Sequence, residues 1–269
     1  MRYRMELAYD GAEFCGWQIQ PRCPSVQEEL EKALQTLLKC RTAVTGAGRT
    51  DTGVSASCYV AHFDADAPVP EALQAPGGAM DCAQLRYKMN AILPKSVCIM
   101  KISPAADDFH ARFDAVRRQY SYYLHRSKDP FLERTSYYYA YPDVDFEAMN
   151  RAARLLLGTH DFSCFEKSGG DNKTSVCTVS SARWEPYEPA VCCSPEGCWR
   201  FVIEADRFLR NMVRAIVGTL LEVGRGRRSV EDFASLILPA QPEKGPSRRS
   251  AAGESVPGHA LFLTDIRYD

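Results

Sequence analysis

The chain has 269 residues, of which 45% are hydrophobic and 25% are charged. This apolar content is sufficient for one large or two medium globular units, which excludes an intrinsically disordered chain. The formal net charge of −1 excludes a uniformly basic binder of polyanions, so any contact with a nucleic acid requires a local basic patch.

The first residues alternate between apolar and polar side chains, which is the two-residue period of a half-buried strand. The apolar positions of this predicted strand are Tyr3, Met5, Leu7 and Tyr9. Charged residues interrupt this segment, so it lacks the apolar core of a secretion signal. No apolar stretch in the rest of the sequence approaches the length of a membrane span. We therefore expect a soluble, cytoplasmic protein with no membrane partner.

The eleven cysteines of the chain contain no C-x-x-C spacing. The closest group, Cys192, Cys193 and Cys198, has no histidine nearby and does not match a zinc-binding pattern. We therefore expect reduced thiols, as is usual in the cytosol, and no metal site.

The rest of the first half alternates helices, strands and loops. Ser25 is expected to begin a helix, because Glu28 three residues later completes a capping box and apolar residues then recur at helical spacing as far as Leu38. We expect a glycine turn next, a strand at 59–63, an irregular excursion at 65–80, a short helix at 84–93 and a strand at 97–102. A boundary near 104–108 divides the chain into two units, 1–106 and 107–269.

The second half shows the same mixture of elements. Strands are predicted at 120–124, 199–205 and 261–268. Helices are predicted at 146–157 and 209–223, and each helix is followed by a glycine that is suited to a C-terminal cap. Residues 192–197 are expected to connect a hairpin. The Pro-, Gly- and Ser-rich stretch 240–257 carries Lys244, Arg248 and Arg249 and predicts a mobile basic loop. The pattern indicates an α+β fold in two halves, with sheets covered by helices on one side.

One carboxylate stands in a turn that is punctuated by three glycines, Gly46, Gly48 and Gly53. Glycine is favoured where the backbone needs a positive φ or where a Cβ would crowd a neighbour. Asp51 lies in this turn close to Arg49, whose guanidinium can keep a carboxylate ionised and oriented. The spacing fits neither the dinucleotide fingerprint nor the Walker loop. The turn therefore indicates either a single reactive acid or, from its composition alone, an ordinary loop.

Six arginines and a single acid lie between residues 207 and 228. Arg207, Arg210 and Arg214 stand at i, i+3 and i+7, which places them on one face of the predicted helix at 209–223. Such a stripe is commonly a solvated surface. Here the helix is otherwise apolar, so we expect its charged face to look into a cleft, where Asp51 or substrate phosphates would be the anionic partners.

Aromatic rings and arginines also alternate at 109–113 and 117–120, where His110 and Arg112 stand between two phenylalanines. This combination is typical of proteins that stack unpaired RNA bases on rings and grip phosphates with guanidinium groups. The alternative is a set of core aromatics flanked by surface arginines. The histidines are scattered, and no Ser/His/Asp or Cys/His arrangement indicates a catalytic triad.

Taken together, these segments resemble the tRNA pseudouridine synthase A family nearly from end to end. The matching residues of the first half are Tyr9-Asp10-Gly11, Phe14, Gly16-Trp17-Gln18, Ser25-Val26-Gln27-Glu28, Ala47-Gly48-Arg49-Thr50-Asp51 and Gly53-Val54. Those of the second half are Asp108-Phe109-His110-Ala111-Arg112-Phe113, Tyr120, Leu157-Gly158, Asp161-Phe162, Met212-Val213-Arg214, Ile216-Val217-Gly218 and Glu222-Val223-Gly224. Each motif is weak alone, whereas their order and spacing together are highly specific.

The resemblance implies a pseudouridine synthase fold, with two related α/β halves that each contain an antiparallel or mixed sheet and that leave a central cleft for RNA. In the family, the aspartate matching Asp51 is the nucleophile, the arginine matching Arg214 pairs with it, and Arg49 lies alongside. The tyrosine matching Tyr120 contacts the flipped base, and we assign contacts with the RNA to His110, Arg112, Arg207 and Arg210. The family also implies a homodimer that binds tRNA without a metal or an organic cofactor.

The resemblance implies that uridines 38, 39 and 40 of the tRNA anticodon stem and loop become pseudouridine. The reaction exchanges the N1–C1′ bond for a C5–C1′ bond, for which one carboxylate nucleophile suffices. Asp51 could attack C1′, add to C6 of the base, or drive a glycal route, and these alternatives remain open. Two other functions also remain open, a pseudouridine synthase for other RNAs and a non-catalytic tRNA chaperone.

Overall fold

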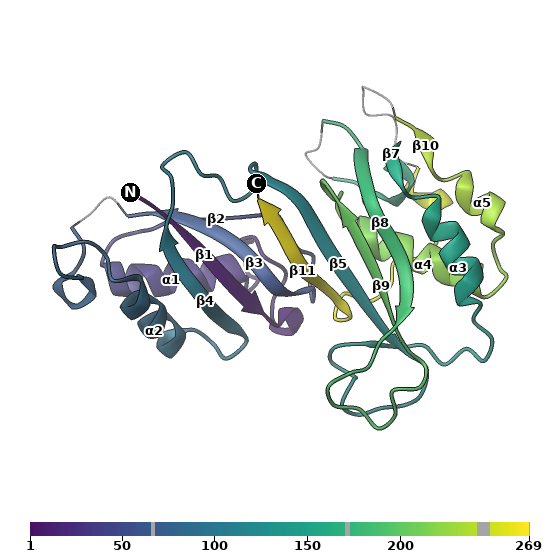
Figure 1. The fold of residues 1–269 in the computed structure, drawn as a ribbon, viewed down its shortest axis with the longest axis horizontal. Helices are drawn as coiled ribbons and strands as arrows, with labels where there is room; N and C mark the ends of the chain where they lie inside the picture. Colours follow the sequence, from purple (N-terminus) through teal and green to yellow (C-terminus); the bar gives the residue numbers. More distant parts are fainter. Residues whose placement is uncertain (66–67, 170–172, 241–247, 269) are drawn as a thin grey trace. The chain divides into compact units, whose positions relative to one another are not determined.

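The computed structural model describes residues 1–65, 68–169, 173–240 and 248–268, and its elements are drawn in Figure 1. The chain divides into two compact units. Unit 1 contains Met1–Val116 together with the C-terminal residues from Leu263 on, and unit 2 contains Arg117–Phe262. Within the described ranges, no helix is long and apolar enough to span a membrane.

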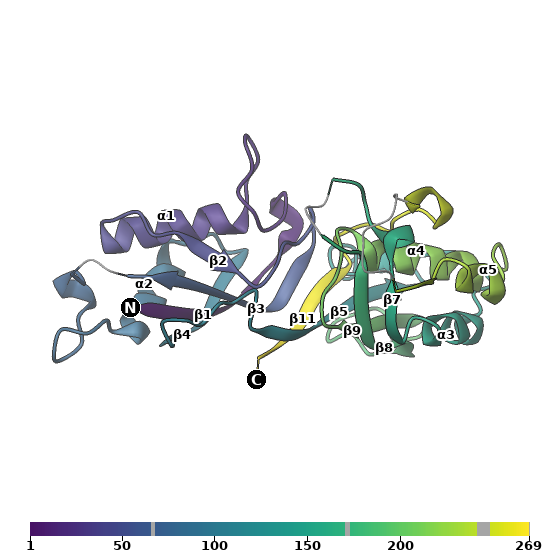
Figure 2. The same ribbon diagram turned by 90° about the horizontal axis from the view of Figure 1, so that it is seen from above.

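Unit 1 is a sheet with two helices on one of its faces. The strands β1 (Arg2–Tyr9), β3 (Ser55–Asp64), β4 (Val97–Pro104) and β11 (Leu261–Tyr268) lie in the order β11-β3-β1-β4, and β2 (Val44–Gly46) also pairs with β3. The helices α1 (Val26–Leu38) and α2 (Cys82–Ile92) contact each other on the same side of the sheet (Figure 2). Two short 3₁₀ helices, η1 (Gly11–Glu13) and η2 (Glu71–Leu73), lie in the connections.

The local signals for β1 and α1 are confirmed. Every second residue of β1 is buried, beginning at Tyr3, because alternate side chains of a strand point to opposite faces. Ser25 caps α1, since its hydroxyl accepts a hydrogen bond from the amide of Glu28 at 3.3 Å. The predicted strands and helices at 59–63, 84–93 and 97–102 are also present as β3, α2 and β4.

Unit 2 has a mixed sheet in the order β10-β7-β8-β9-β5. Its strands are β5 (Ala115–His125), β7 (Gly158–Asp161), β8 (Val176–Pro186), β9 (Cys198–Ala205) and β10 (Leu238–Pro239), and β6 (Tyr137–Tyr138) pairs with β5 in parallel. The helix α3 (Phe146–Arg154) packs on β8 and contacts α4 (Met212–Gly224) and α5 (Val230–Ala234). The 3₁₀ helices η3 (Ser163–Phe165) and η4 (Arg249–Ala251) complete the unit.

The predicted helix at 209–223 is wrong at its beginning. The helix α4 begins only at Met212, because Asn211 before it has a left-handed backbone with a φ of 64°. Arg207 and Arg210 therefore lie in the connection between β9 and α4, and they do not share a helical face with Arg214. The apolar residues near 209 suggested a helix, but the chain there is still tied to the sheet, since the carboxylate of Asp206 accepts hydrogen bonds from the amides of Arg207 at 2.7 Å and of Thr178 on β8 at 2.8 Å.

The predicted helix end at Gly158 is also wrong. The helix α3 ends at Arg154, and Gly158, which has a φ of 103°, begins the strand β7. A left-handed glycine can end a helix or start a new element after a turn, and only the pairing of β7 with β8 distinguishes the two.

The expectation of reduced thiols is wrong for one pair of cysteines. Cys15 and Cys23 form a disulfide with a Cα–Cα distance of 6.0 Å, whereas the other nine cysteines are free. The chain folds back on itself here, because the amide of Cys15 donates a hydrogen bond to the carbonyl of Pro24 at 2.8 Å. The spacing of the cysteines did not reveal the pair, since the two are eight positions apart and only the folded loop brings them into bonding range.

The predicted mobile loop at 240–257 lies partly outside the described residues, which omit 241–247. Its remaining part is ordered by specific contacts. The guanidinium of Arg249 donates to the hydroxyl of Ser255 at 2.8 Å, and the amide of Gly253 donates to the hydroxyl of Thr219 on α4 at 3.0 Å. The expectation of a mobile loop is therefore wrong for residues 248–257.

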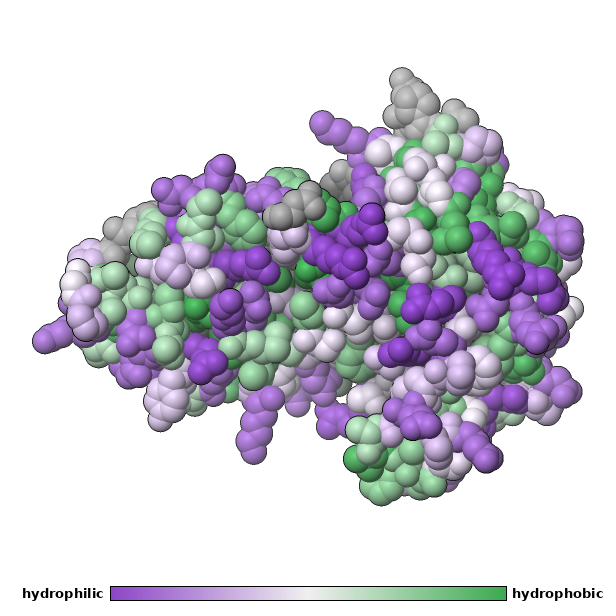
Figure 3. Space-filling model, viewed as in Figure 1, coloured by the Kyte–Doolittle hydropathy of each residue, from purple (hydrophilic) through white to green (hydrophobic). Residues whose placement is uncertain are grey.

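The hairpin between β8 and β9 is confirmed by their antiparallel pairing, and its connection packs against the loop that follows β5. The carboxylate of Asp129 accepts hydrogen bonds from the amides of Cys193 at 2.5 Å and Phe131 at 2.9 Å. Figure 3 shows hydrophobic surface at the tip of these loops. Phe131 in the loop after β5 and Val191 in the connection between β8 and β9 are both exposed.

The close approach of α4 to the C-terminal loop leads to a stability prediction. A Cβ added at Gly218 would collide with the backbone carbonyl of Glu254. At a solvent-exposed helix position, replacing Gly by Ala raises the free energy of unfolding by about 1 kcal/mol. Overpacking a close contact instead lowers it by about 1–3 kcal/mol. We expect Gly218→Ala to lower the free energy of unfolding in urea titrations. The control Gly48→Ala, whose Cβ meets no atom within 4 Å, should not destabilise, and a stabilised Gly218→Ala would contradict the packing.

Candidate active site

The predicted glycine turn connects β2 to β3, and it carries a half-buried Asp51 and an exposed Arg49. Gly53 has a φ of 76°, which side-chain-bearing residues rarely adopt. A Cβ at Gly46 would collide with the hydroxyl of Tyr59 and the indole of Trp17, whereas a Cβ at Gly48 would meet no atom. The steric reason for glycine is therefore confirmed at two of the three positions.

Three connections tie the segment around Asp51 to the strand β1 and the loop that follows it. The hydroxyls of Tyr9 and Thr50 form a buried hydrogen bond of 2.9 Å. The amide of Trp17 donates to the carbonyl of Thr50 at 3.4 Å, and the amide of Gly53 donates to the carbonyl of Phe14 at 3.3 Å. These contacts fix the backbone on both sides of Asp51.

A fully buried tyrosine of β3 supports the same turn from below. The hydroxyl of Tyr59 donates a short hydrogen bond to the carbonyl of Gly48, and its ring stacks on Trp17 with a centroid distance of 4.1 Å. Sequence reasoning assigned Tyr59 only to a strand and Trp17 only to a family motif. No local pattern in the sequence connects either residue to Asp51, because only the folded chain brings Trp17 and Tyr59 together beside the turn.

Arg214 is held near the start of α4 by the C-terminal loop. Its Nε donates to the carbonyl of Val256 at 2.7 Å, and the amide of Val256 donates back to the carbonyl of Arg214 at 3.3 Å. Burial raises the pKa of Tyr122, and the positive charge of Arg214 opposes this rise, so the guanidinium lies within electrostatic range of that hydroxyl. Both side chains belong to unit 2.

Tyr120 lies on β5, two residues before Tyr122 and hence on the same face of the strand. It is half-buried, and its ring meets Phe208 edge-to-face with a centroid distance of 5.1 Å. Phe208, which sequence reasoning did not select, lies in the same connection as Arg207 and Arg210. The guanidinium of Arg210 donates to the carbonyl of Ser168 at 3.2 Å.

His110 and Arg112 lie in a compact turn, residues 109–114, in unit 1. The Nδ1 atom of His110 accepts hydrogen bonds from the amides of Arg112 and Phe113, both at 3.2 Å. The amide of Ala111 donates to Nδ1 of His62 at 3.1 Å. Burial, assisted by the charge of Arg2, lowers the pKa of His62 to about 4, so this acceptor is neutral at physiological pH.

Each unit thus brings together part of the predicted set. Unit 1 holds Arg49 and Asp51 in one turn and His110 and Arg112 in another, while unit 2 holds Tyr120, Arg207, Arg210 and Arg214. The predicted pairing of Asp51 with Arg214 remains a prediction. In the parts of the chain that the structure describes, no group of three or more His, Cys, Asp or Glu side chains could hold a metal ion.

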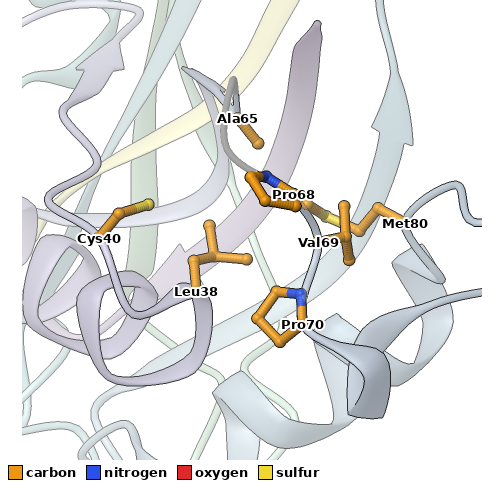
Figure 4. Close-up of a pocket in the computed structure, with 7 residues that line it drawn as sticks. All are labelled: Leu38, Cys40, Ala65, Pro68, Val69, Pro70 and Met80. Atoms are coloured by element: carbon orange, nitrogen blue, oxygen red, sulfur yellow. The ribbon is translucent and has the colours of Figure 1, made fainter.

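A small apolar cavity in unit 1 is unrelated to these residues (Figure 4). It has a volume of about 10 Å³ and is lined by Leu38, Cys40, Ala65, Pro68, Val69, Pro70 and Met80. A space of this size holds at most one water molecule, and its apolar walls would bind that water poorly. The cavity is therefore a packing defect beneath the irregular excursion and not a substrate pocket.

Comparisons with known proteins match the chain over its whole length. A family profile described as tRNA pseudouridine synthase matches residues 152–269. The tRNA pseudouridine synthase A of Bacteroides fragilis is 45% identical over 267 residues, which cover 99% of this chain and 96% of that protein. The tRNA pseudouridine synthase A of Bacillus licheniformis is 38% identical over 272 residues, covering 100% of both chains. The chain belongs to the tRNA pseudouridine synthase A family.

Membership in the tRNA pseudouridine synthase A family confirms the resemblance inferred from the short motifs. It also confirms that the chain is an enzyme of the isomerase class that modifies tRNA. The mixed α+β structure agrees with the expected fold class. The geometry of the turn around Asp51 shows what several of the family motifs do in this chain, since Tyr9, Phe14 and Trp17 all contact that turn.

The support of the turn by Tyr59 leads to a second prediction. Tyr59→Phe removes the hydroxyl that donates to the half-buried carbonyl of Gly48, which costs about 0.5–1.5 kcal/mol of unfolding free energy, the worth of a typical hydrogen bond. The control Tyr3→Phe removes, in the same sheet, a hydroxyl that donates to the weak acceptor sulfur of Met1 at 3.3 Å. Urea denaturation should show a larger loss for Tyr59→Phe, and equal losses would mean that the hydroxyl does not support the turn.

Proposed function

We propose that this chain isomerises uridine to pseudouridine in the anticodon stem and loop of tRNA, at positions 38, 39 and 40. The observation that carries the proposal is the full-length relationship to tRNA pseudouridine synthase A proteins. The braced turn that presents Asp51 supports it, because the reaction needs one well-positioned carboxylate and transfers neither electrons nor a group to a second molecule.

In this proposal, a carboxylate oxygen of Asp51 is the nucleophile. The N1–C1′ bond of the uridine breaks, the uracil turns, C5 forms the new bond to C1′, and the proton of C5 leaves while N1 gains one. Attack on C1′, addition to C6 and elimination to a glycal all use this carboxylate. Arg49 and Arg214 would orient it, since hydrogen bonds between a guanidinium group and a carboxylate fix their relative geometry.

Tyr120 is proposed to stack on the flipped uracil and to assist removal of the C5 proton. Its support by Phe208 limits its freedom to move, which reduces the entropy lost on binding. Extruding a uridine from a stem or stacked loop costs on the order of a few kcal/mol. Contacts of the RNA with His110, Arg112, Arg207 and Arg210 would offset this cost. We further propose a cytoplasmic homodimer that uses no metal or organic cofactor.

The role of Asp51 is tested by Asp51→Asn. We expect pseudouridine formation in an unmodified tRNA transcript, measured by nucleoside chromatography, to fall by at least about 10³-fold, as is usual when a nucleophile is removed. The Kd for the transcript should remain similar. The control Asp81→Asn replaces the cap of α2 by another good cap residue and should retain full activity. Normal turnover by Asp51→Asn would refute the mechanism.

The role of Arg214 is tested by Arg214→Ala, with the exposed Arg227→Ala as a control. Loss of Arg214 removes its bond to Val256 and strands the proposed carboxylate partner. We expect lower activity together with a loss of about 1.5–3 kcal/mol in unfolding free energy, the worth of a hydrogen bond from a charged group. Wild-type activity and melting temperature in Arg214→Ala would show that the pairing is absent.

Two alternatives predict different outcomes in cells. A synthase for other RNAs would leave the anticodon stem and loop unchanged when the protein is deleted, and a tRNA chaperone would leave every pseudouridine in place. Mapping pseudouridines in total RNA from cells with the wild-type protein, with Asp51→Asn and without the protein separates the three. The proposal expects positions 38, 39 and 40 to lose the modification in both altered strains.

A further inference from the structure

Two phenylalanines flank His110 in the same short motif but have different surroundings. Phe109 packs on Tyr268 with a centroid distance of 5.4 Å, and Arg4 lies over the rings of both. Phe113 has 73% of its surface exposed, the largest exposure among the large hydrophobic side chains of the described residues. Phe109 therefore serves the packing of unit 1, whereas the ring of Phe113 is presented to the solvent.

The backbone that presents Phe113 is held by several hydrogen bonds. The amide of Phe113 donates to His110, and the carboxylate of Asp114 accepts from the amide of His110 at 2.7 Å. The carbonyl of Ala111 accepts from the hydroxyl of Tyr268 at 2.6 Å. An exposed ring on a flexible loop would lose conformational entropy on binding, whereas these hydrogen bonds already restrict the backbone of this turn.

The ring itself is also oriented by its neighbours. The imidazole of His110 lies 4.3 Å from the ring of Phe113 with an angle of 34° between the planes, and the guanidinium of Arg112 is 5.6 Å from its centroid. Single exposed apolar side chains are common on protein surfaces. Phe113 differs from them because two planar groups hold it, one of which carries a positive charge.

We propose that Phe113, oriented by His110 and Arg112, stacks on an unpaired base of the tRNA substrate. An aromatic face accepts any nucleobase, and an adjacent guanidinium can contact the phosphate that follows the base. The inference deepens the proposed function, on which it rests for the identity of the RNA. Phe113 is thus a binding residue outside the set Asp51, Arg49, Arg214 and Tyr120.

A base fits this surface better than a protein partner does. A stable protein interface buries a contiguous area of about 800 Å² on each side, with a largely apolar centre. The other exposed residues of the turn, Arg112 and Asp114, are charged, so within the turn the exposed apolar surface is that of a single ring. One nucleobase has the size of such a ring.

The test measures the Kd of purified variants for an unmodified tRNA transcript. Base stacking is worth enough that Phe113→Ala should raise the Kd by about 5- to 100-fold. Phe113→Trp should bind at least as well as wild type, because it keeps an aromatic face. Phe113→Leu should bind as weakly as Phe113→Ala, since it keeps apolar area but has no π face. Melting temperatures of all three should match wild type.

Controls separate stacking from other effects. Tyr87→Ala removes another aromatic side chain of unit 1 that is 69% exposed, on α2, and should leave the Kd unchanged. Binding of a fully double-stranded RNA should be insensitive to Phe113→Ala, because its bases are paired. Wild-type affinity of Phe113→Ala for tRNA would overturn the inference, as would wild-type affinity of Phe113→Leu, which would indicate an apolar contact such as a protein partner makes.

Failure of this inference is distinguishable from failure of the proposed function. If the wild-type protein binds tRNA but forms no pseudouridine, the catalytic proposal fails while the Kd series still decides the role of Phe113. If the wild-type protein forms pseudouridine and the Kd is the same in all Phe113 variants, only the stacking proposal fails.

Discussion

The candidate active site depends on the packing of a glycine turn onto buried aromatic rings. Tyr59 and Trp17 stack on each other beneath the turn and leave no room for a Cβ at Gly46. Ordering a loop costs about 1–2 kcal/mol per residue in backbone entropy. Burial of these rings and the hydrogen bonds of the Tyr9 and Tyr59 hydroxyls offset that cost, so Asp51 stands on a backbone that is fixed before substrate binds.

This constraint explains why the motifs of the N-terminal part are separated in sequence but act together. Phe14 and Trp17 contact the turn through their backbones, and Tyr9 contacts it through its hydroxyl. Gly11 and Gly16 have no space for a Cβ, because the carbonyls of Val54 and Thr50 lie against them. The disulfide between Cys15 and Cys23 closes the loop that carries Trp17. The motifs are therefore parts of one local structure, and together they fix the position of Asp51.

Unit 2 uses a different means to hold its charged residue. Arg214 is anchored by backbone contacts with Val256, and Gly218 one helical turn later lets the chain at Glu254 approach α4 closely. The loop 248–257 is thus ordered by the helix that it covers, although its composition is typical of a mobile segment. Two rigid supports, one made of aromatic rings and one of backbone contacts, carry the acid and the arginine proposed to act on the same uridine.

The sequence alone was sufficient to predict those helices and strands whose signals, such as alternation or a capping residue, lie within the element itself. The alternation in β1 and the cap of α1 by Ser25 need no distant partner, and both are confirmed. The family followed from short motifs in a fixed order. The sequence also singled out Asp51, because a charged residue among glycines is recognisable without knowledge of its neighbours.

Only the tertiary structure decided the features that depend on distant contacts. The strand β8 was not predicted, because its small and polar residues become a strand through pairing with β7 and β9. The start of α4 moved to Met212 because Asn211 adopts a left-handed backbone. The stacking of Tyr59 on Trp17 joins residues far apart in the chain. The disulfide between Cys15 and Cys23 and the exposure of Phe113 depend on how the folded chain bends and on what covers it. The sequence by itself determined which side chains are available for the chemistry. Tertiary packing decided which of these side chains are held rigidly, because the residues that restrict them come from other parts of the chain and are not visible in a local sequence pattern.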